Sequence, residues 1–318
     1  MPLIKVAVLD DYQGVALRMA NWSSLDGRAE LTVFNDHVSE LDAVVERLAP
    51  FAVVCAMRER TPMGRPLLER LPNLKLIVST GARNASIDLV AAKGLGITVC
   101  GTGYVNHGAA ELTWALIMAA AKYIPQEHAS VHAGGWQTKI GKDLKGSTIG
   151  IVGLGTVGAS IARYARAFEM HVIAWSANLT EAKAAEHGAR LVSKAQLFRD
   201  ADIVTLHLVL SERTKRVVGA AELASMKPTA LLVNTSRGPL VDEAALIDAL
   251  GKNAIGGAAL DVFDAEPLPP GHPLRLLPNA LTTPHIGFVT EQTYKVFYQD
   301  SVEAILAWLD GRLVRRMN

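Results

Sequence analysis

Short apolar runs rich in valine and isoleucine alternate along the chain with longer segments of helical periodicity, beginning at the first residues. The first group of runs predicts strands at 4–9, 30–34, 51–55, 75–79 and 97–99. After about residue 100, a second group predicts strands near 148–152, 171–175, 189–192, 202–207, 230–234, 256–260 and 280–283. Runs such as ALLVN are apolar throughout, so we expect parallel sheets with helices on both faces.

Composition narrows the class of protein. Hydrophobic residues make up 50% of the 318 residues and charged residues 20%, which is typical of a globular chain and excludes disorder as the main state. The 32 basic and 31 acidic residues give a net charge of +1, so nothing favours a nucleic acid partner.

Membrane segments and a disulfide framework are not expected. The start, MPLIKVAVLDDY, has a lysine within its apolar stretch and reads as a strand rather than a signal peptide, and the charge-free stretches are too short or too glycine-rich to span a bilayer. Cys55 and Cys100 each follow an apolar run and are interpreted as small core residues. We therefore expect a cytoplasmic protein.

A glycine motif follows the predicted strand at 148–152. The segment TIGIVGLGTVG places Gly153, Gly155 and Gly158 in the spacing of a dinucleotide-binding turn, directly before a predicted helix. Gly153 would permit the tight turn, Gly155 would admit a pyrophosphate, and Gly158 would let the helix pack closely on the strand. Taken alone, the motif leaves open a glycine-rich turn that binds nothing.

The residues beyond these glycines bear on the cofactor. Backbone amides around Thr156 and Val157, before the predicted helix Ala159–Phe168, would donate to phosphate oxygens. The next strand ends at Ser176, where a carboxylate would bind the ribose of NAD. The sequence has neither that carboxylate nor an arginine for the phosphate of NADP, so it favours NAD only slightly and leaves NADP open.

Three further segments carry polar residues where apolar strands end. They are NTSRG with Arg237, DVFDAEP with Glu266, and TPHIG with His285. In an open α/β sheet, the carboxyl ends of strands line the ligand crevice. A guanidinium there can bind a carboxylate, and an imidazole can exchange a proton near neutral pH. For each residue taken alone, a solvated loop position is the alternative interpretation.

Taken together and in order, these motifs resemble the D-isomer-specific 2-hydroxyacid dehydrogenases, a family that includes 3-phosphoglycerate, glyoxylate/hydroxypyruvate and D-lactate dehydrogenases. The resemblance rests on VGLGTVG at 152–158, on MKPTALLVNTSRGPLVDEAALIDAL at 226–250, and on GAALDVFDAEP followed by TTPHIG. It implies an oxidoreductase that acts on a CH–OH group, transferring a hydride between NAD(P)H and a 2-keto or D-2-hydroxy acid.

The resemblance also implies roles for single residues. Arg237 binds the substrate carboxylate and polarises its carbonyl, His285 is the acid/base, and Glu266 pairs with that histidine. Asp261 contacts the nicotinamide side of the cofactor. These roles agree with the chemistry, because a carboxylate beside an imidazole stabilises its protonated form.

Substrate-binding residues are implied in the loops after the first group of strands. The matching positions are Arg58, Gly81, Ala82 and Arg83, where the amides of the two small residues would form a small anion-binding nest. Arg83 departs from many relatives, which have an uncharged residue there; a second anionic group on the substrate and exposure to solvent are both open interpretations. The segment His207-Leu208-Val209 departs from the His-x-Pro of relatives, with no effect that the sequence reveals.

For the fold, the pattern and the resemblance together predict two Rossmann-like or flavodoxin-like doubly wound domains with a cleft between them. Residues 1–100 plus 289–318 would form the substrate-binding (catalytic) domain and 101–288 the dinucleotide-binding domain, with the last helix, Glu291–Leu309, packing back on the first. The family and the apolar helix GAAELTWALIMAAAKYI at 108–124 also suggest a homodimer.

A metal site, a regulatory protein and a formate dehydrogenase are the alternative interpretations. His128 and His132 stand four residues apart, but no acid or cysteine completes a metal site, so none is expected. A dinucleotide-sensing regulatory protein of the corepressor type is the alternative to an enzyme; retention of Arg237, Glu266 and His285 favours catalysis. Glu266 also argues against the formate dehydrogenases of the family, which usually have glutamine there.

Overall fold

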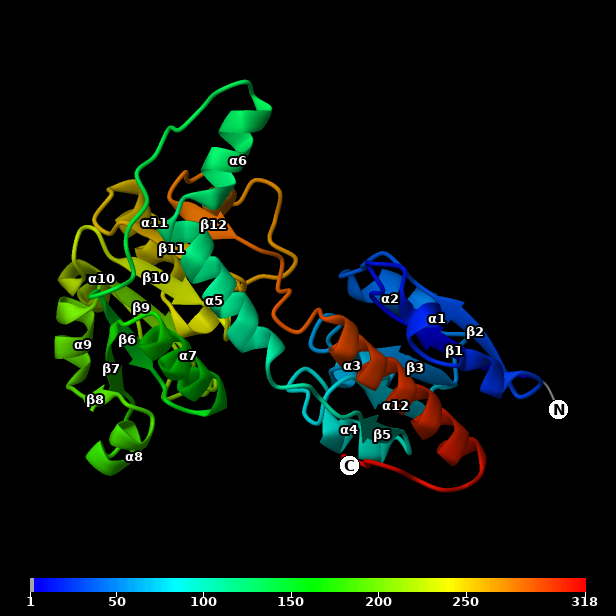
Figure 1. The fold of residues 1–318 in the computed structure, drawn as a ribbon. Helices are drawn as coiled ribbons and strands as arrows, with labels where there is room; N and C mark the ends of the chain where they lie inside the picture. The colour runs from blue at the N-terminus through cyan, green and yellow to red at the C-terminus, as the bar shows by residue number, and fades with distance from the viewer. Residues whose placement is uncertain (1–2) are drawn as a thin grey trace. The chain divides into compact units, whose positions relative to one another are not determined.

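The computed structural model describes residues 3–318 and divides them into two compact units. The first unit contains the chain up to Val105 together with Thr290–Asn318, and the second contains Asn106–Val289. Figure 1 shows both units as layers of helices around a sheet.

The first unit is built on a parallel sheet of five strands in the order β2-β1-β3-β4-β5. Its strands are β1 (Ile4–Val8), β2 (Ala29–Val33), β3 (Val53–Ala56), β4 (Leu76–Ser79) and β5 (Thr98–Gly101). Each lies at the place that the apolar pattern predicted, to within two residues at either end. The strand order reverses between β1 and β3, which is where open α/β sheets bind ligands at the carboxyl ends of their strands.

The helices of the first unit include the last helix of the chain. They are α1 (Ala16–Met19), the 3-10 helix η1 (Trp22–Leu25), α2 (Leu41–Leu48), α3 (Arg65–Leu68), α4 (Leu89–Gly94) and α12 (Glu291–Leu309). Helix α12 contacts β4, α1 and η1, and it buries Phe297 and Tyr298 in this unit. Aromatic side chains of this size dominate the packing energy of a small core.

The second unit has a parallel sheet of seven strands in the order β12-β11-β10-β9-β6-β7-β8. The strands are β6 (Thr148–Val152), β7 (His171–Trp175), β8 (Arg190–Leu191), β9 (Ile203–Leu206), β10 (Leu231–Asn234), β11 (Gly257–Leu260) and β12 (Ala280–Thr282). This is the Rossmann order with one more strand at the β12 edge, and its order reverses between β6 and β9. The predicted class, α/β with parallel sheets, is confirmed.

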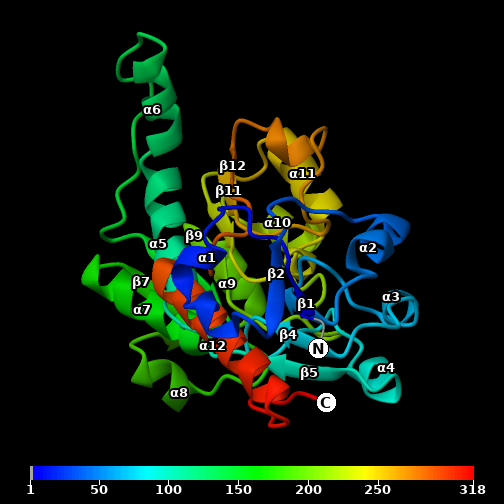
Figure 2. The same cartoon turned by 90° about the vertical axis from the view of Figure 1, so that its right-hand side faces the viewer.

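Helices cover both faces of this sheet (Figure 2). They are α5 (Gly108–Ala121), α6 (Ile124–His132), α7 (Thr156–Ala167), α8 (Glu181–Glu186), α9 (Lys194–Asp200), α10 (Ala220–Ser225) and α11 (Glu243–Gly251), with short 3-10 turns η2 (Gly238–Leu240) and η3 (Pro273–Arg275). Successive residues of one strand pack in different hydrophobic cores. Leu232 packs in the cluster that contains Phe198, and Val233 packs in the cluster that contains Ile161. Burial on both faces explains the unbroken apolar runs of the sequence.

Two other sequence expectations can be compared with the structure. Cys55 and Cys100 are buried as free thiols within β3 and β5, as expected of small core residues. Among the helices of residues 3–318, none combines the length and the apolar character needed to cross a membrane.

Candidate active site

The glycine turn lies at the end of β6, where the strand order of the second sheet reverses. Gly153 has φ +98°, a conformation that favours glycine, and a Cβ there would lie 2.6 Å from the carbonyl oxygen of His207 after β9. A Cβ on Gly158 would lie 2.1 Å from the carbonyl oxygen of Gly153. At Gly155, in contrast, a Cβ would meet nothing within 4 Å. Two of the three glycines therefore serve packing, and the middle one leaves open space in front of the backbone.

Helix α7 begins at Thr156, three residues earlier than the predicted start at Ala159. Gly155 is its N-cap and supplies no side-chain cap, so the amides of Thr156 and Val157 belong to the first turn, whose N–H groups have no partner within the helix. The positive end of a helix of 12 residues lies behind them. The open space at Gly155 and these donors fit the pyrophosphate of a dinucleotide.

Ser176 directly follows β7, as predicted. Its carbonyl oxygen accepts a hydrogen bond from the amide of Leu179 at 3.1 Å, which forms a turn of Ser176, Ala177, Asn178 and Leu179. This turn contains neither an acid for the ribose of NAD nor an arginine for the phosphate of NADP.

Arg237 lies on the loop after β10 and is half-buried. The side-chain amide of Asn234 donates to the Arg237 carbonyl oxygen at 2.8 Å, and the Arg237 guanidinium donates to the Ser236 carbonyl oxygen at 2.7 Å. The next residue, Gly238, packs against the loop after β11, because a Cβ on it would lie 2.1 Å from the carbonyl carbon of Phe263. The loop that carries Arg237 is therefore fixed against the loop that leads to Glu266.

Glu266 and His285 form an ion-pair contact between the loops after β11 and β12. The Glu266 Oε2 atom lies 2.5 Å from Nδ1 of His285, and Oε1 accepts a hydrogen bond from the Phe263 amide at 2.8 Å. The two side chains remain 33% and 24% exposed, so the imidazole is accessible to a small molecule. The ring of Phe288 meets the imidazole edge to face with 5.5 Å between centroids.

His285 has φ +53°, an uncommon conformation for a residue with a side chain, and Asp261 holds the segment around it. One Asp261 oxygen accepts hydrogen bonds from Thr283 Oγ1 at 2.6 Å and the Ile286 amide at 2.8 Å; the other accepts from the Gly287 amide at 2.8 Å. The carboxyl group is fully buried, and this burial raises the pKa of Asp261. These hydrogen bonds hold the His285 loop in place, and the contact of Asp261 with the nicotinamide side of the cofactor stays a prediction.

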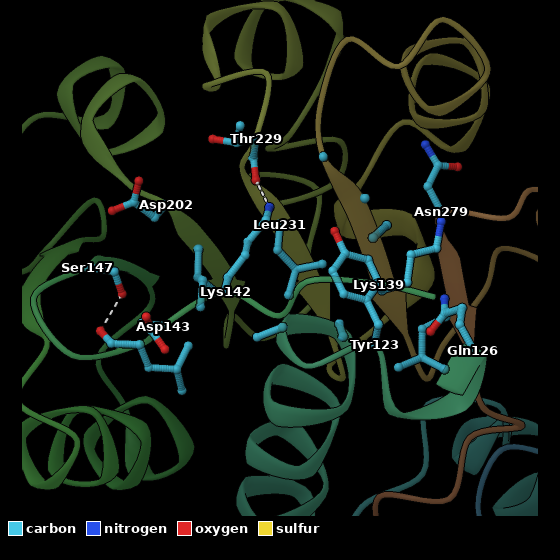
Figure 3. Close-up of a pocket in the computed structure, with 18 of the residues that line it drawn as sticks. Tyr123, Gln126, Lys139, Lys142, Asp143, Ser147, Asp202, Thr229, Leu231 and Asn279 are labelled. Carbon is cyan, nitrogen blue, oxygen red and sulfur yellow. Dashed lines mark hydrogen bonds between the residues drawn. The ribbon is translucent and has the colours of Figure 1, made fainter. Parts of the chain in front are cut away.

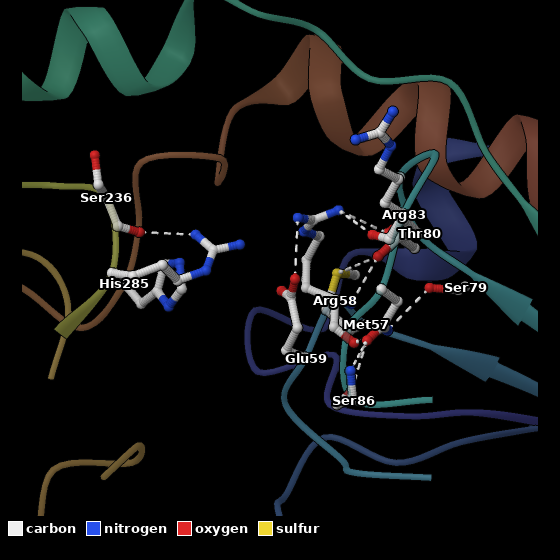
Figure 4. A network of polar contacts seen from close by, with 12 residues as sticks. Met57, Arg58, Glu59, Ser79, Thr80, Arg83, Ser86, Ser236 and His285 are labelled. Carbon is white, nitrogen blue, oxygen red and sulfur yellow. Dashed lines mark hydrogen bonds and ion pairs between the residues drawn. The ribbon is translucent and has the colours of Figure 1, made fainter. Parts of the chain in front are cut away.

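In the first unit, Arg58 lies on the loop after β3 and covers the loop after β4 (Figure 4). It also has a left-handed backbone, with φ +51°. Its guanidinium donates to the Thr80 carbonyl oxygen at 3.1 Å, contacts Glu59 at 3.5 Å and lies 5.7 Å from the centre of the Tyr104 ring. Its charge is therefore partly balanced within the unit.

The backbone of the loop after β4 differs in one respect from the expected anion nest. The Gly81 amide donates to Thr102 Oγ1 at 2.7 Å, so that donor is already used inside the protein. The Arg58 guanidinium also occupies the space where a Cβ on Gly81 would lie, with Nη1 at 2.0 Å. Ala82 and Arg83 are exposed on the same loop. Binding of an anion by the backbone amides near Gly81 and Ala82 stays a prediction, and the Ala82 amide is the donor of the pair that is not bonded to Thr102.

His207 lies on the loop after β9, next to the glycine turn, and the sequence did not indicate its surroundings. Its Nε2 lies 2.9 Å from Thr205 Oγ1, and its Nδ1 is buried with no hydrogen-bond partner among the described residues. Burial lowers the pKa of His207 to about 3, so the ring is neutral at physiological pH. Its departure from the His-x-Pro pattern was the only sequence signal, and burial of a loop histidine depends on tertiary packing.

Within residues 3–318, no three His, Cys, Asp or Glu side chains gather in a way that would hold a metal ion. The rings of His128 and His132 meet edge to face on α6, with 4.3 Å between centroids. The polar residues of the second unit instead converge at the carboxyl edge of its sheet, on the loops after β6, β10, β11 and β12.

The sequence of the chain is similar to those of known proteins. Residues 114–287 match the model described as the NAD-binding domain of D-isomer specific 2-hydroxyacid dehydrogenases. The chain is 37% identical over 257 residues to a glyoxylate reductase of Aeropyrum pernix, covering 78% of this chain and 77% of that protein. It is also 37% identical over 270 residues to a D-3-phosphoglycerate dehydrogenase of Methanocaldococcus jannaschii, covering 84% of this chain but only 51% of that longer protein.

A solved structure extends the likeness to nearly the whole chain. The phosphoglycerate oxidoreductase of Vibrio cholerae O395 superposes with a TM-score of 0.92 at 39% identity, covering 97% of this chain and 100% of that one. These relatives are named as enzymes, and none supports the regulatory alternative. The chain therefore belongs to the D-isomer-specific 2-hydroxyacid dehydrogenases, oxidoreductases that transfer a hydride between a nicotinamide dinucleotide and a 2-keto or 2-hydroxy acid.

Proposed function

We propose that this chain interconverts a small 2-keto acid and its D-2-hydroxy acid, with His285 as the acid/base, Glu266 as its partner and Arg237 as the anchor of the substrate carboxylate. The observation that carries the proposal is the 2.5 Å contact between Glu266 Oε2 and His285 Nδ1. It joins two loops at the carboxyl edge of the sheet, where ligands of open α/β sheets bind.

His285 is suited to exchange a proton with the substrate oxygen. Because Nδ1 lies against Glu266, Nε2 is the nitrogen that remains to face a substrate. In the reductive direction, Nε2 donates its proton to the carbonyl oxygen as the hydride arrives at carbon; in the oxidative direction it removes the hydroxyl proton. The carboxylate beside Nδ1 stabilises the imidazolium in both directions.

Arg237 supplies a positively charged guanidinium. A guanidinium matches a carboxylate in shape and binds it through two parallel hydrogen bonds. The bond from Asn234 to the Arg237 carbonyl oxygen and the packing of Gly238 support a fixed position for this anchor. A fixed cation stabilises the developing charge on the substrate without reorganisation.

The dinucleotide would be held by Gly153, Gly155 and Gly158 with the amides of Thr156 and Val157, as their geometry allows. When bound, its nicotinamide ring supplies or accepts the hydride. We propose a slight preference for NAD over NADP, because no arginine occupies the turn that begins at Ser176. Replacing Ser176 with Asp is expected to strengthen that preference by repelling the extra phosphate.

The first unit is proposed to bind substrate and the second to bind the dinucleotide, with Arg58, Ala82 and Arg83 as substrate contacts. The basis is the resemblance, together with the place of these residues at the carboxyl ends of β3 and β4. Gly81 is proposed to contribute to the same site by leaving room for the Arg58 guanidinium, which occupies the position that a Cβ on Gly81 would take.

Two further expectations belong to this proposal. We propose a homodimer, for which helix α5 and the segment after it are the candidate interface. We also propose a cytoplasmic location, because the two cysteines are free thiols, as is usual in reducing compartments.

Turnover of a panel of 2-keto acids tests the proposal. Glyoxylate, hydroxypyruvate, phosphohydroxypyruvate, pyruvate and bulkier 2-keto acids would each be offered with NADH and with NADPH, and chiral analysis would follow the product. We expect at least one substrate to give the D-2-hydroxy acid. Tight NADH binding without turnover of any member would instead favour the regulatory alternative.

A further inference from the structure

Residues 101–103 connect the end of β5 with the part of the chain that enters the second unit, and we call them the connecting segment. They lie directly against the loop after β4. A Cβ on Gly101 would be 2.8 Å from the carbonyl oxygen of Gly81 and 3.5 Å from Cα of Ala82. The backbones of the two segments are therefore in contact at a distance that no side chain at position 101 would allow.

Two hydrogen bonds join Gly81 and Thr102 across this contact. The Gly81 amide donates to Thr102 Oγ1 at 2.7 Å, and the Thr102 amide donates to the Gly81 carbonyl oxygen at 3.2 Å. The Thr102 hydroxyl in turn donates to the Gly103 carbonyl oxygen at 2.9 Å. Thr102 is only 2% exposed, so water has little access to replace these bonds. One buried hydroxyl thus accepts from the loop after β4 and donates to the connecting segment.

The connecting segment is itself held by α12 and by the residues after it. The Gly103 amide donates to Asp300 Oδ2 at 2.7 Å. Arg315 Nε donates to the Gly101 carbonyl oxygen at 3.2 Å and lies 3.7 Å from Asp300 Oδ2. The Arg315 carbonyl oxygen accepts from the Gly101 amide at 2.8 Å. Both ends of the connecting segment are fixed in this way, and Thr102 therefore has a defined position.

The loop that Thr102 supports carries the substrate contacts proposed for the first unit. Since the Gly81 amide is bonded to Thr102, the Ala82 amide is the donor of the pair that remains for an anion. The Arg58 guanidinium lies over Gly81, with Nη1 2.0 Å from the position of a Cβ there. A displacement of Gly81 would therefore disturb both groups, and small errors in the position of a binding group weaken its contact with a substrate.

We propose that Thr102 is a positioning residue of the substrate site, whose hydroxyl holds Gly81 so that the Ala82 amide and Arg58 are correctly placed for an anionic group of the substrate. The inference rests on the proposed function and adds a residue that acts through Gly81. Hydride transfer changes the charge at the carbonyl oxygen of a keto acid and leaves its anionic groups unchanged. The loop therefore holds ground state and transition state about equally, and Thr102 governs KM rather than kcat.

Thr102→Val tests the hydroxyl, because valine keeps the branched shape of the side chain. KM for a keto acid that wild type reduces should rise about tenfold, since the Gly81 amide loses its acceptor. The values of kcat and of the NADH dissociation constant should stay within about twofold of wild type. Thr102→Ser retains the hydroxyl and should return KM to within about twofold of wild type. Wild-type KM in Thr102→Val would overturn the proposal.

Asp300→Ala tests the same support from the surface, because the Asp300 side chain is 25% exposed and its loss leaves the core intact. It removes the acceptor of the Gly103 amide and should raise KM about threefold with kcat unchanged. If Thr102→Val does not fold, this variant decides, and a wild-type KM in Asp300→Ala then overturns the proposal.

Two other hydroxyl groups provide matched controls. Ser301 is fully buried in the first unit and donates to the Phe297 carbonyl oxygen at 2.7 Å within α12. Ser147 lines a cavity of about 530 Å³ at the amino ends of the strands of the second sheet, where it donates to the Leu144 carbonyl oxygen at 2.6 Å (Figure 3). Neither bond involves the loop after β4, so Ser301→Ala and Ser147→Ala should keep the wild-type KM. An equal rise of KM in these variants would overturn a specific role of Thr102.

Hydrogen exchange of the Gly81 amide, followed by NMR, measures the support without turnover. Exchange should be at least about tenfold faster in Thr102→Val than in wild type, because the amide has lost its acceptor. An unchanged rate would overturn the proposal, and a faster rate with a wild-type KM would overturn the link to substrate binding. A wild type that reduces no 2-keto acid would instead contradict the proposed function, and the exchange rate would then decide the role of Thr102 in holding the loop.

Discussion

Glu266 Oε2 lies 2.5 Å from His285 Nδ1, while Glu266 Oε1 accepts a hydrogen bond from the Phe263 amide. The backbone thus fixes the carboxylate, and the carboxylate in turn orients the imidazole. Asp261 holds the other side of the same loop through the amides of Ile286 and Gly287. Two carboxylates therefore set the position of one histidine, and the chemistry proposed for His285 depends on that arrangement.

His285→Ala is expected to lower kcat by about 10²- to 10⁴-fold, because general acid/base catalysis typically contributes that factor. The dissociation constant for NADH should stay within about twofold of wild type, since the glycine turn is untouched. Steady-state kinetics and a fluorescence titration of NADH measure the two effects. A variant that keeps wild-type kcat would exclude His285 as the acid/base.

Arg237→Ala is expected to raise KM for the keto acid and to lower kcat, because the guanidinium serves both the bound substrate and the transition state. Arg237→Lys should recover only part of the loss, since an ammonium lacks the paired donors of a guanidinium. If the variant changed only the KM for NADH, the anchor role would be wrong.

Glu266→Gln keeps the size of the side chain and removes its charge. Reduction of a keto acid needs a protonated His285, and without the carboxylate less imidazolium is present at a given pH. The pH–rate profile for reduction should therefore fall away at lower pH than in wild type. Profiles of kcat/KM from pH 5 to 9 measure the shift, and identical profiles would remove Glu266 from the mechanism.

The glycines of the turn should respond differently to alanine. Gly155→Ala should leave Tm near that of wild type, because a Cβ there meets nothing within 4 Å, yet weaken NADH binding by occupying the open space. Gly158→Ala should lower both the Tm and the affinity for NADH, because its Cβ would lie 2.1 Å from the Gly153 carbonyl oxygen. Paired melting curves and NADH titrations would distinguish them. Full NADH affinity in Gly155→Ala would contradict binding at this turn.

His207 provides a prediction on pH and stability. Burial lowers its pKa to about 3, so below about pH 6.5 the unfolded chain binds a proton that the folded chain does not. This group therefore makes wild type lose stability as pH falls from about 6.5 toward 3, by about 1.4 kcal/mol per pH unit at most. His207→Gln removes that loss. As the pH falls from 7 to 4.5, the difference between the Tm of the variant and the Tm of wild type should therefore increase in favour of the variant. A constant difference would mean that His207 titrates normally.

The class of the fold and most candidate residues follow from the sequence alone, for a physical reason. Buried parallel strands need continuous apolar runs, so β4 and β10 are visible as LIVS and LLVN without any tertiary information. Polar residues on the loops after such runs lie at one edge of the sheet, which makes Arg237, Glu266 and His285 candidates, and the resemblance to the dehydrogenase family implied their roles.

Only the tertiary structure decided how the candidate groups are used. The bond between the Gly81 amide and Thr102, the three hydrogen bonds to Asp261 and the burial of His207 all join segments far apart in the sequence or depend on how they pack. Local patterns specify elements and their edges, whereas the partner of a polar atom depends on contacts that form only when distant segments meet.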